Sequence, residues 1–331
     1  MFLGIKKAFD LPFSWLFAII AGGFILFIVI YATSNFIGIS QTVEGSQSAQ
    51  QLLNYFNPVV NGITSGQTVP PIVFKKDTRI YFGCSVSSSK SVFFGRETIN
   101  FSEQSGFLQK WTEQSISVSR YNKYIFTENM EEGKKFYIFS KPFFAGFKVD
   151  DLIVMSSDNY CFIGAPSVIS DDVTGLQLVN VNVSETINSC SKDSVKVCFG
   201  STFSGCNMSV YPDSTGDYDK GYVMKNGKSL NYFGSLIYGA IFSSPEIYEC
   251  NVKRLGNKIS ELADIYSEKI SIIQQKDCNS LVSPNLELMK QIVNSANSSL
   301  GFVGIYDIVK DMNQKNCDVN SDCWLYSPEK C

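Results

Sequence analysis

The chain opens with an apolar stretch from Leu11 to Tyr31, LPFSWLFAIIAGGFILFIVIY, in which no residue is charged. At about 1.5 Å per residue, a helix over residues 11–32 is roughly 30 Å long, the thickness of the hydrocarbon core of a bilayer. We therefore predict a transmembrane helix over residues 11–32. Ser14, Ala18 and Gly22 recur at every fourth position, a spacing of small residues that lets two membrane helices pair closely.

The residues before this stretch predict its orientation. Residues 1–10 carry Lys6 and Lys7 against Asp10, and basic residues beside the first span stay in the cytoplasm. We expect residues 1–10 to be a cytoplasmic tail and the rest of the chain beyond the span to lie outside the cell. A cleaved signal peptide is the alternative, but its apolar core is usually about 7–15 residues and a small-x-small site follows it.

Residues 72–235 change to short runs rich in β-branched and aromatic residues, bounded by Gly, Asn, Asp and Ser. Such runs are typical of half-buried strands, and Asn226-Gly227 between two of them indicates a hairpin. We predict an antiparallel, sandwich-like β-rich domain. Residues 33–71 are first helix-compatible and then rich in Gly and Pro, which predicts a helical stalk and a linker.

Residues 236–331 predict a helical C-terminal region. Ser244 and Pro245 are favoured at the start of a helix, and apolar residues then recur at steps of three and four from Leu255 to Ile273. Ser283-Pro284 marks a second start. The predicted fold is thus an N-terminal transmembrane helix followed by an α+β ectodomain.

All ten cysteines lie beyond the predicted span. An even number of cysteines outside a membrane, without histidine or a C-x2-C pair, predicts disulfides rather than a zinc site. The sequence leaves their pairing open, and Cys198–Cys206 and Cys317–Cys323 are the short-range pairs that we considered. The candidates are Cys84, Cys161, Cys190, Cys198, Cys206, Cys250, Cys278, Cys317, Cys323 and Cys331.

Two kinds of short motif lie on the same side of the span. Four N-x-[ST] sequons are candidate glycosylation sites at Asn100, Asn182, Asn207 and Asn297. Near the C-terminus, Asp318, Asn320, Asp322 and Glu329 have the spacing of ligands in a calcium loop. Cys323 stands where such a loop needs Gly, so a turn closed by a disulfide is the alternative. No other cofactor is indicated.

Charge and residue usage exclude several functions. With 28 Lys and Arg against 31 Asp and Glu, the chain lacks the basic excess that nucleic-acid binding requires. It contains no histidine, which excludes Ser-His-Asp and Cys-His hydrolases, and no phosphate- or dinucleotide-binding motif is present. A hydrolase using a pair of carboxylates needs neither feature, so it stays an alternative. We expect no catalysis.

Two segments resemble those of a known family. One lies at the predicted membrane helix and the other at the start of the predicted helical C-terminal region. KAFDLPFSWLFAII at residues 7–20 and YGAIFSSPEIYECNVKRL at residues 238–255 resemble segments of single-span membrane proteins of small-genome (DPANN-type) archaea. The N-terminus is also similar to type IV pilin-like signals, which are cut before the apolar helix, here after Ala8. Asp10 and Phe13 depart from that pattern. The first resemblance implies an archaeal cell surface.

These features together predict a single-pass cell-membrane protein with a binding or structural role in adhesion or in organising the envelope. Its expected partners are the membrane, other envelope proteins and a second copy paired through the membrane helix, but not nucleic acid. A pilin-like or secretion-machine subunit that assembles through the N-terminal helix is the first alternative. A surface hydrolase is the second.

Overall fold

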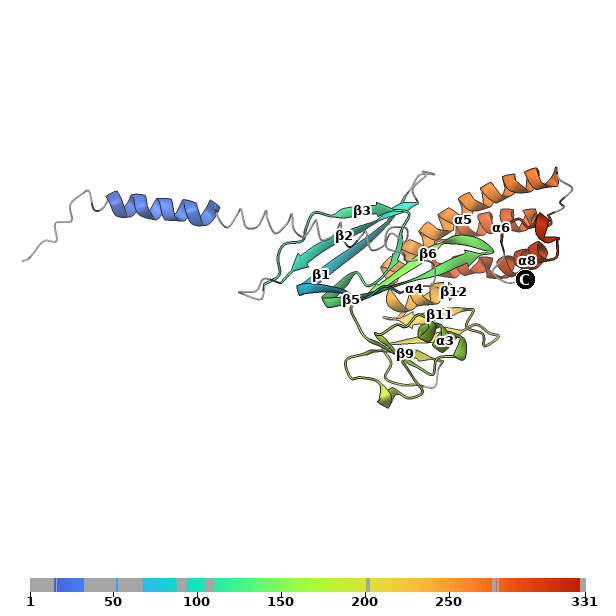
Figure 1. The fold of residues 1–331 in the computed structure, drawn as a ribbon, viewed down its shortest axis with the longest axis horizontal. Helices are drawn as coiled ribbons and strands as arrows, with labels where there is room; N and C mark the ends of the chain where they lie inside the picture. The colour runs from blue at the N-terminus through green and yellow to red at the C-terminus, as the bar shows by residue number, and fades with distance from the viewer. Residues whose placement is uncertain are drawn as a thin grey trace, which may run out of the picture.

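The structure, a computed structural model, describes residues 15, 17–32, 52, 68–87, 94–104, 110–200, 203–275, 278 and 280–327. Two six-stranded sheets are followed in the chain by helices that pack against them (Figure 1). The strands begin at Ile72 and end at Phe233, and the C-terminal helices begin at Leu236. The predicted order of a β-rich domain and a helical C-terminal part is therefore confirmed.

Sheet 1 has the strand order β3-β2-β1-β5-β6-β4. Its neighbouring strands are antiparallel except β4 and β6, which are parallel. The run Leu152–Met155 in β6 is apolar throughout because its alternate side chains enter two different hydrophobic clusters, one on each face of the sheet. The strands are β1 (Ile72–Val86), β2 (Gly95–Glu103), β3 (Val118–Tyr121), β4 (Tyr124–Phe126), β5 (Met130–Ala145) and β6 (Phe147–Ser156).

Sheet 2 has the order β12-β11-β10-β9-β7-β8. Strands β10, β11 and β12 are antiparallel, but β8, β7, β9 and β10 run parallel to one another. The prediction of an antiparallel domain is wrong here, because helix α3 (Ser167–Gly175) supplies the crossover that parallel strands require. The strands are β7 (Tyr160–Ile163), β8 (Val181–Ser184), β9 (Val195–Phe199), β10 (Met208–Pro212), β11 (Lys220–Lys225) and β12 (Lys228–Phe233).

Helix α4 (Leu236–Phe242) joins the two sheets into one core. It contacts β4 and β6 of sheet 1 and β11 and β12 of sheet 2, and all seven of its residues are buried. A Cβ atom at Gly239 would lie 2.6 Å from the ring of Phe126, so glycine is what permits this close approach. The two sheets are thus packed on a shared helix rather than directly face to face.

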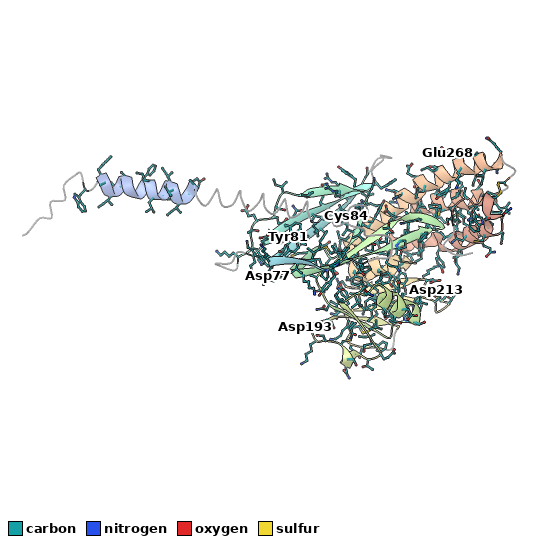
Figure 2. All side chains as sticks on the ribbon, viewed as in Figure 1. Asp77, Tyr81, Cys84, Asp193, Asp213 and Glu268 are labelled. Atoms are coloured by element: carbon teal, nitrogen blue, oxygen red, sulfur yellow. A yellow bond between two sulfur atoms is a disulfide. The ribbon has the colours of Figure 1, made fainter. Side chains whose placement is uncertain are left out.

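Helix α5 (Pro245–Gln274) begins where the sequence predicts. The Ser244 hydroxyl accepts a hydrogen bond from the backbone N–H of Ile247 at 3.3 Å. Leu255 and Ile259 are buried in the core. Glu268 lies on the exposed face of the helix (Figure 2). The other helical segments are α6 (Ser283–Ser295), α7 (Ser299–Phe302), α8 (Tyr306–Cys317), and the short 3-10 turns η1 (Ile187–Ser189), η2 (Val303–Ile305) and η3 (Ser321–Cys323).

Four disulfides are described, and they join segments both near and distant in the sequence. Among the short-range pairs that we considered, Cys198–Cys206 is confirmed and Cys317–Cys323 is wrong, because Cys323 bonds to Cys278 of the segment after α5. Cys317 is also disulfide-bonded, and Cys331 lies outside the described residues. The four pairs are Cys84–Cys250, Cys161–Cys190, Cys198–Cys206 and Cys278–Cys323.

The N-terminal apolar stretch is described as helix over residues 17–32. Within the part of the chain that the structure covers, no helix is both long and apolar enough to span a bilayer. Residues 11–14 and 16 of the predicted span lie outside that part. The membrane span therefore stays a prediction.

Leu52 is the described residue of the predicted stalk. It is helical, only 2% exposed, and belongs to the hydrophobic cluster on sheet 1 that includes Ile80, Phe82 and Ile247. At Leu52, therefore, the chain packs into the domain instead of standing away from it.

Candidate functional site

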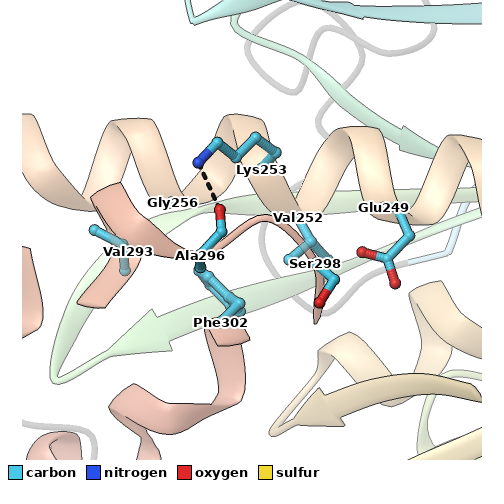
Figure 3. Close-up of a pocket in the computed structure, with 8 residues that line it drawn as sticks. All are labelled: Glu249, Val252, Lys253, Gly256, Val293, Ala296, Ser298 and Phe302. Atoms are coloured by element: carbon cyan, nitrogen blue, oxygen red, sulfur yellow. Dashed lines mark hydrogen bonds between the residues drawn. The ribbon is translucent and has the colours of Figure 1, made fainter. Parts of the chain in front are cut away.

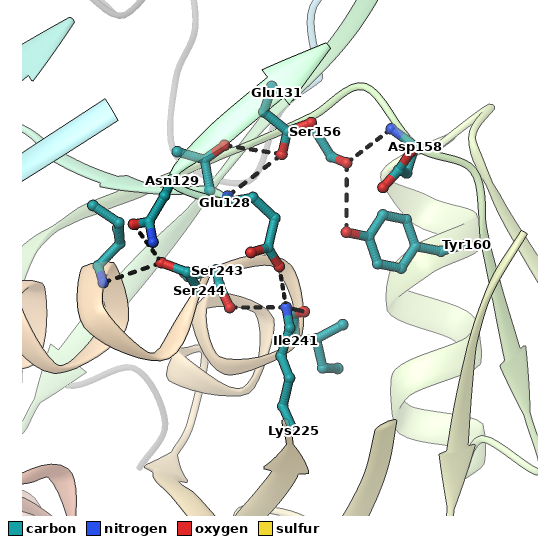
Figure 4. A network of polar contacts seen from close by, with 12 residues as sticks. Glu128, Asn129, Glu131, Ser156, Asp158, Tyr160, Lys225, Ile241, Ser243 and Ser244 are labelled. Atoms are coloured by element: carbon teal, nitrogen blue, oxygen red, sulfur yellow. Dashed lines mark hydrogen bonds and ion pairs between the residues drawn. The ribbon is translucent and has the colours of Figure 1, made fainter. Parts of the chain in front are cut away.

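A buried polar cluster lies where the two sheets meet α4 and the start of α5 (Figure 4). At its centre Lys225, the last residue of β11, is 5% exposed. Its Nζ donates to the carbonyl oxygens of Ile241 and Ser243, at 2.9 and 2.8 Å, and forms an ion pair with Glu128 at 2.5 Å. Lys225 thus satisfies carbonyl groups at the C-terminal end of α4, where a positive charge is favourable.

Glu131 is the most deeply buried carboxylate of this cluster, with 2% exposure. Its Oε2 accepts hydrogen bonds from the backbone N–H and the hydroxyl of Ser157 at 2.7 and 2.6 Å. Its Oε1 accepts from the hydroxyl of Thr127 at 3.1 Å and from the N–H of Glu128 at 3.4 Å. Burial nevertheless raises the pKa of Glu131 to about 7, since the hydrogen bonds from Ser157 offset only part of the desolvation.

Asp158 and Tyr160 complete the cluster on the side of sheet 2 (Figure 4). Partial burial, together with the negative charge of Glu128, raises the pKa of Asp158. Burial also raises the pKa of the Tyr160 hydroxyl, which accepts a hydrogen bond from Ser156 at 3.5 Å. The two glutamates therefore have structural roles. Glu128 forms an ion pair with Lys225, and the carboxylate of Glu131 accepts four hydrogen bonds.

A second polar centre lies between α5 and sheet 1. Arg254 on α5 and Glu97 on β2 are 0% and 1% exposed, and Arg254 Nη1 donates to Glu97 Oε1 at 2.5 Å. The same Nη1 donates to the side-chain oxygen of Asn251 at 2.7 Å, and the guanidinium lies 4.8 Å from the centre of the Tyr124 ring. Burial raises the pKa of Glu97 to about 7, although the charge of Arg254 opposes this shift.

One cavity of the described part is small (Figure 3). It lies between α5 and the segment that joins α6 to α7, and its volume is about 10 Å³, enough for at most one water molecule. Two polar contacts border it: Lys253 Nζ donates to the carbonyl of Ala296 at 2.6 Å, and Glu249 accepts from the N–H and hydroxyl of Ser299, each at 2.6 Å. This cavity is too small for an organic substrate.

The residues of the predicted calcium loop are only partly described. Asp318 follows the end of α8, and its carboxylate accepts a hydrogen bond from Gln314 at 2.8 Å. Asn320 precedes η3, whereas the side chain of Asp322 and the whole of Glu329 lie outside the described part. In that part, no three His, Cys, Asp or Glu side chains are grouped so that they could hold a metal ion. The calcium loop therefore stays a prediction.

The four sequons differ in accessibility. Asn182, Asn207 and Asn297 are exposed, whereas Asn100 is half-buried in β2 and its amide donates to the carbonyl of Ser115 at 2.9 Å. An oligosaccharide needs a free amide nitrogen and space around it, so Asn100 is the least accessible of the four. Whether any of them is modified stays a prediction.

Two of the three residues that we predict to pair membrane helices lie in the described part of the chain. Ala18 and Gly22 are exposed, and Ser14 lies outside the described residues. A Cβ atom at Gly22 would meet nothing within 4 Å. Helix pairing through these positions stays a prediction.

Sequence analysis did not single out the two polar centres, although strand alternation carries a signal for them. In β11, Val223 and Lys225 are buried while Met224 between them is 38% exposed. In β2, Glu97 shares its inward face with Ile99 and Phe101. Charged residues that occupy the apolar phase of a strand are therefore the signal that identifies these buried centres.

No family model matches the chain, and no curated protein or solved structure is similar to it. Its class therefore follows from its own structure. The four described disulfides indicate a domain of the extracellular or secreted type, because disulfides persist in oxidising compartments and are rare in the cytosol.

Proposed function

We propose that the chain is a membrane-anchored cell-surface protein whose ectodomain has a binding or structural role in the cell envelope. The observation that carries this proposal is the disulfide framework, which fastens both sheets and the helical part. Cys84–Cys250 alone connects residues 166 positions apart. A framework of this kind stabilises a domain that works outside the cell.

The apolar helix supports the anchor. The large hydrophobic side chains described between Trp15 and Tyr31 are 49–67% exposed, on all sides of the helix. A helix that is apolar all round needs a lipid or protein environment. The N-terminus then lies in the cytoplasm, with the ectodomain outside, and the partners are the membrane and other envelope proteins.

One observation favours a binding or structural role over catalysis: the buried carboxylates Glu97 and Glu131 are held by protein donors. The archaeal cell surface implied by the resemblance of residues 7–20 and 238–255 is the proposed setting.

Membrane extraction of the full chain tests the anchor. We expect the protein to stay in the membrane pellet after an alkaline carbonate wash. Ile20→Arg combined with Phe24→Arg should release it, because each charge costs about 2.5–3.5 kcal/mol near the centre of a span. Ile20→Leu combined with Phe24→Leu is the matched control and should stay in the pellet. Release of the unaltered chain would contradict the anchor.

Topology and processing need two further measurements. A protease added outside intact cells should remove an epitope tag placed after Cys331, and a protected tag would contradict the external location. Sequencing of the N-terminus should find Met1 or its simple trimming. A start at Phe9 would instead favour the pilin-like alternative, and a start beyond Ala32 would indicate a released domain.

A further inference from the structure

Four buried polar atoms at the junction of α5 and sheet 1 have no hydrogen-bond partner among the described residues. They are Glu97 Oε2, the Tyr124 hydroxyl, and Nε and Nη2 of Arg254. Buried polar atoms in folded proteins are nearly always bonded to the protein or to ordered water. Because these four atoms belong to Arg254 and to the two side chains that contact its guanidinium, they point to one shared partner.

The chemistry of Arg254 defines how that partner is held. Nη1 already donates to Glu97 and to Asn251, which uses one side of the guanidinium. Nε and Nη2 form the other edge of this planar group, with two nearly parallel donors. The guanidinium also lies 4.8 Å from the centre of the Tyr124 ring, so the tyrosine borders the same space.

We propose that one ordered water molecule is bound between Glu97, Tyr124 and Arg254 and completes this buried ion pair. A water molecule accepts two hydrogen bonds and donates two. The free edge of Arg254 supplies the two donors, Glu97 Oε2 accepts one water hydrogen, and the Tyr124 oxygen accepts the other. One water thus offers one hydrogen bond to each of the four unpaired atoms.

Charge and burial both favour a small, neutral ligand. When Glu97 is ionised, it forms a pair of opposite charges with Arg254, so an added anion would leave the buried site with an excess negative charge. The side chains of Glu97, Tyr124 and Arg254 are at most 1% exposed, so the site is closed to solvent, as a site for a single small ligand is.

The Cys84–Cys250 bridge lies beside the site. Cys84 is the register partner of Glu97 across β1 and β2, and Cys250 lies one helical turn before Arg254 on α5. The bridge therefore holds together the two elements whose separation would open the site. We expect the bound water to exchange slowly with solvent for this reason.

Crystals of the full chain that resolve ordered water test the proposal directly. We expect one density peak within about 2.7–3.2 Å of Glu97 Oε2, the Tyr124 hydroxyl, and Nε and Nη2 of Arg254. A bromide soak distinguishes water from a halide, and no anomalous peak is expected at the site. An anomalous peak there, or well-ordered side chains with no density between them, would overturn the proposal.

Two tyrosine variants test which side chains hold the water. Tyr124→Phe removes one acceptor, so the peak should lose occupancy or move toward Glu97 and Arg254. Tyr248→Phe is the matched control, because its buried hydroxyl donates elsewhere, to the carbonyl of Asn231 at 2.6 Å, and the peak should stay in place. An unchanged peak in Tyr124→Phe crystals would refute the assignment of Tyr124 as a ligand.

Discussion

Replacing Glu131 with glutamine should remove a pH dependence of stability that the buried carboxylate creates. Glu131 is 2% exposed, and the described groups that donate to it, from Ser157, Thr127 and the backbone of Glu128, are all uncharged. Glutamine has nearly the same shape and keeps an oxygen that accepts a hydrogen bond from Ser157. It is neutral at every pH, and the hydrogen bonds lost at its amide nitrogen change the stability by an amount that does not depend on pH. The pH dependence of the difference therefore isolates the effect of the charge.

The sign of the effect follows from the direction of the pKa shift. The pKa of Glu131 rises from its ordinary value of 4.5 in the unfolded chain to about 7 in the folded protein. Between these two values the folded state binds a proton that the unfolded state has released, so stability falls as the pH increases. The contribution is fully present below pH 4.5 and lost above about pH 7.

The magnitude follows from the size of the same shift. A difference between 4.5 and about 7, at about 1.36 kcal/mol per pKa unit, corresponds to a loss of about 3 kcal/mol across the window. The free energy of unfolding of Glu131→Gln, relative to the unaltered chain, should therefore rise by about this amount between pH 4.5 and pH 8. Glu97, whose pKa is also raised by burial, is present in both proteins and cancels from the comparison.

Urea unfolding of the full chain in detergent, with its disulfides intact, measures this difference at half-unit steps of pH. Tryptophan fluorescence and far-ultraviolet circular dichroism should give coincident transitions. Glu132→Gln, at the exposed neighbouring position, is the matched control and should leave the slope over this window unchanged. Parallel stability curves for Glu131→Gln and the unaltered chain, or a difference that falls with increasing pH, would refute the reasoning.

Three further predictions concern the framework and the surface. Replacing both cysteines of a disulfide with serine should lower the free energy of unfolding in urea by about 5 kcal/mol at Cys84–Cys250 and by about 2–3 kcal/mol at Cys198–Cys206. The first loss is larger because that disulfide closes a loop of 166 residues, against 8 for the second. Equal losses would contradict this prediction. Leu52→Ala should cost about 2–5 kcal/mol by the same measurement. Val73→Ala, at a 69% exposed position, is its control, and a neutral Leu52→Ala would mean that this contact does not stabilise the domain. In a host that glycosylates sequons, peptide mass spectrometry should find the exposed sites more occupied than half-buried Asn100, and equal occupancy would refute the effect of burial.

The kind and order of elements could be predicted from the sequence because local interactions specify them. The hairpin at Asn226-Gly227 forms because both residues adopt positive φ, 52° and 73°, which suits the tight turn between β11 and β12. The start of α5 follows from Ser244 as a cap and Pro245 in the first turn. Each of these features depends on neighbouring residues, so the sequence around it contains the whole cause.

The candidate site was much less predictable. Lys225 precedes a hairpin turn, a position that is usually solvated, yet it is buried because carbonyl groups at the end of α4 converge on it. Glu131 stands among charged neighbours in β5 and is buried only because Ser157 and Thr127 come from other segments. Nothing adjacent to either residue specifies these partners.

By itself, then, the sequence determined that a β-rich part precedes a helical part, where the Asn226-Gly227 hairpin and helix α5 begin, and that cysteines beyond the apolar stretch form disulfides. The tertiary structure alone decided that sheet 2 contains parallel strands, that Cys84 pairs with Cys250 and Cys278 with Cys323, and that Glu97 meets Arg254 across 157 residues. The physical reason is range. Backbone propensity and capping act over a few residues, whereas strand direction, disulfide pairing and burial of charge depend on which distant segments pack together.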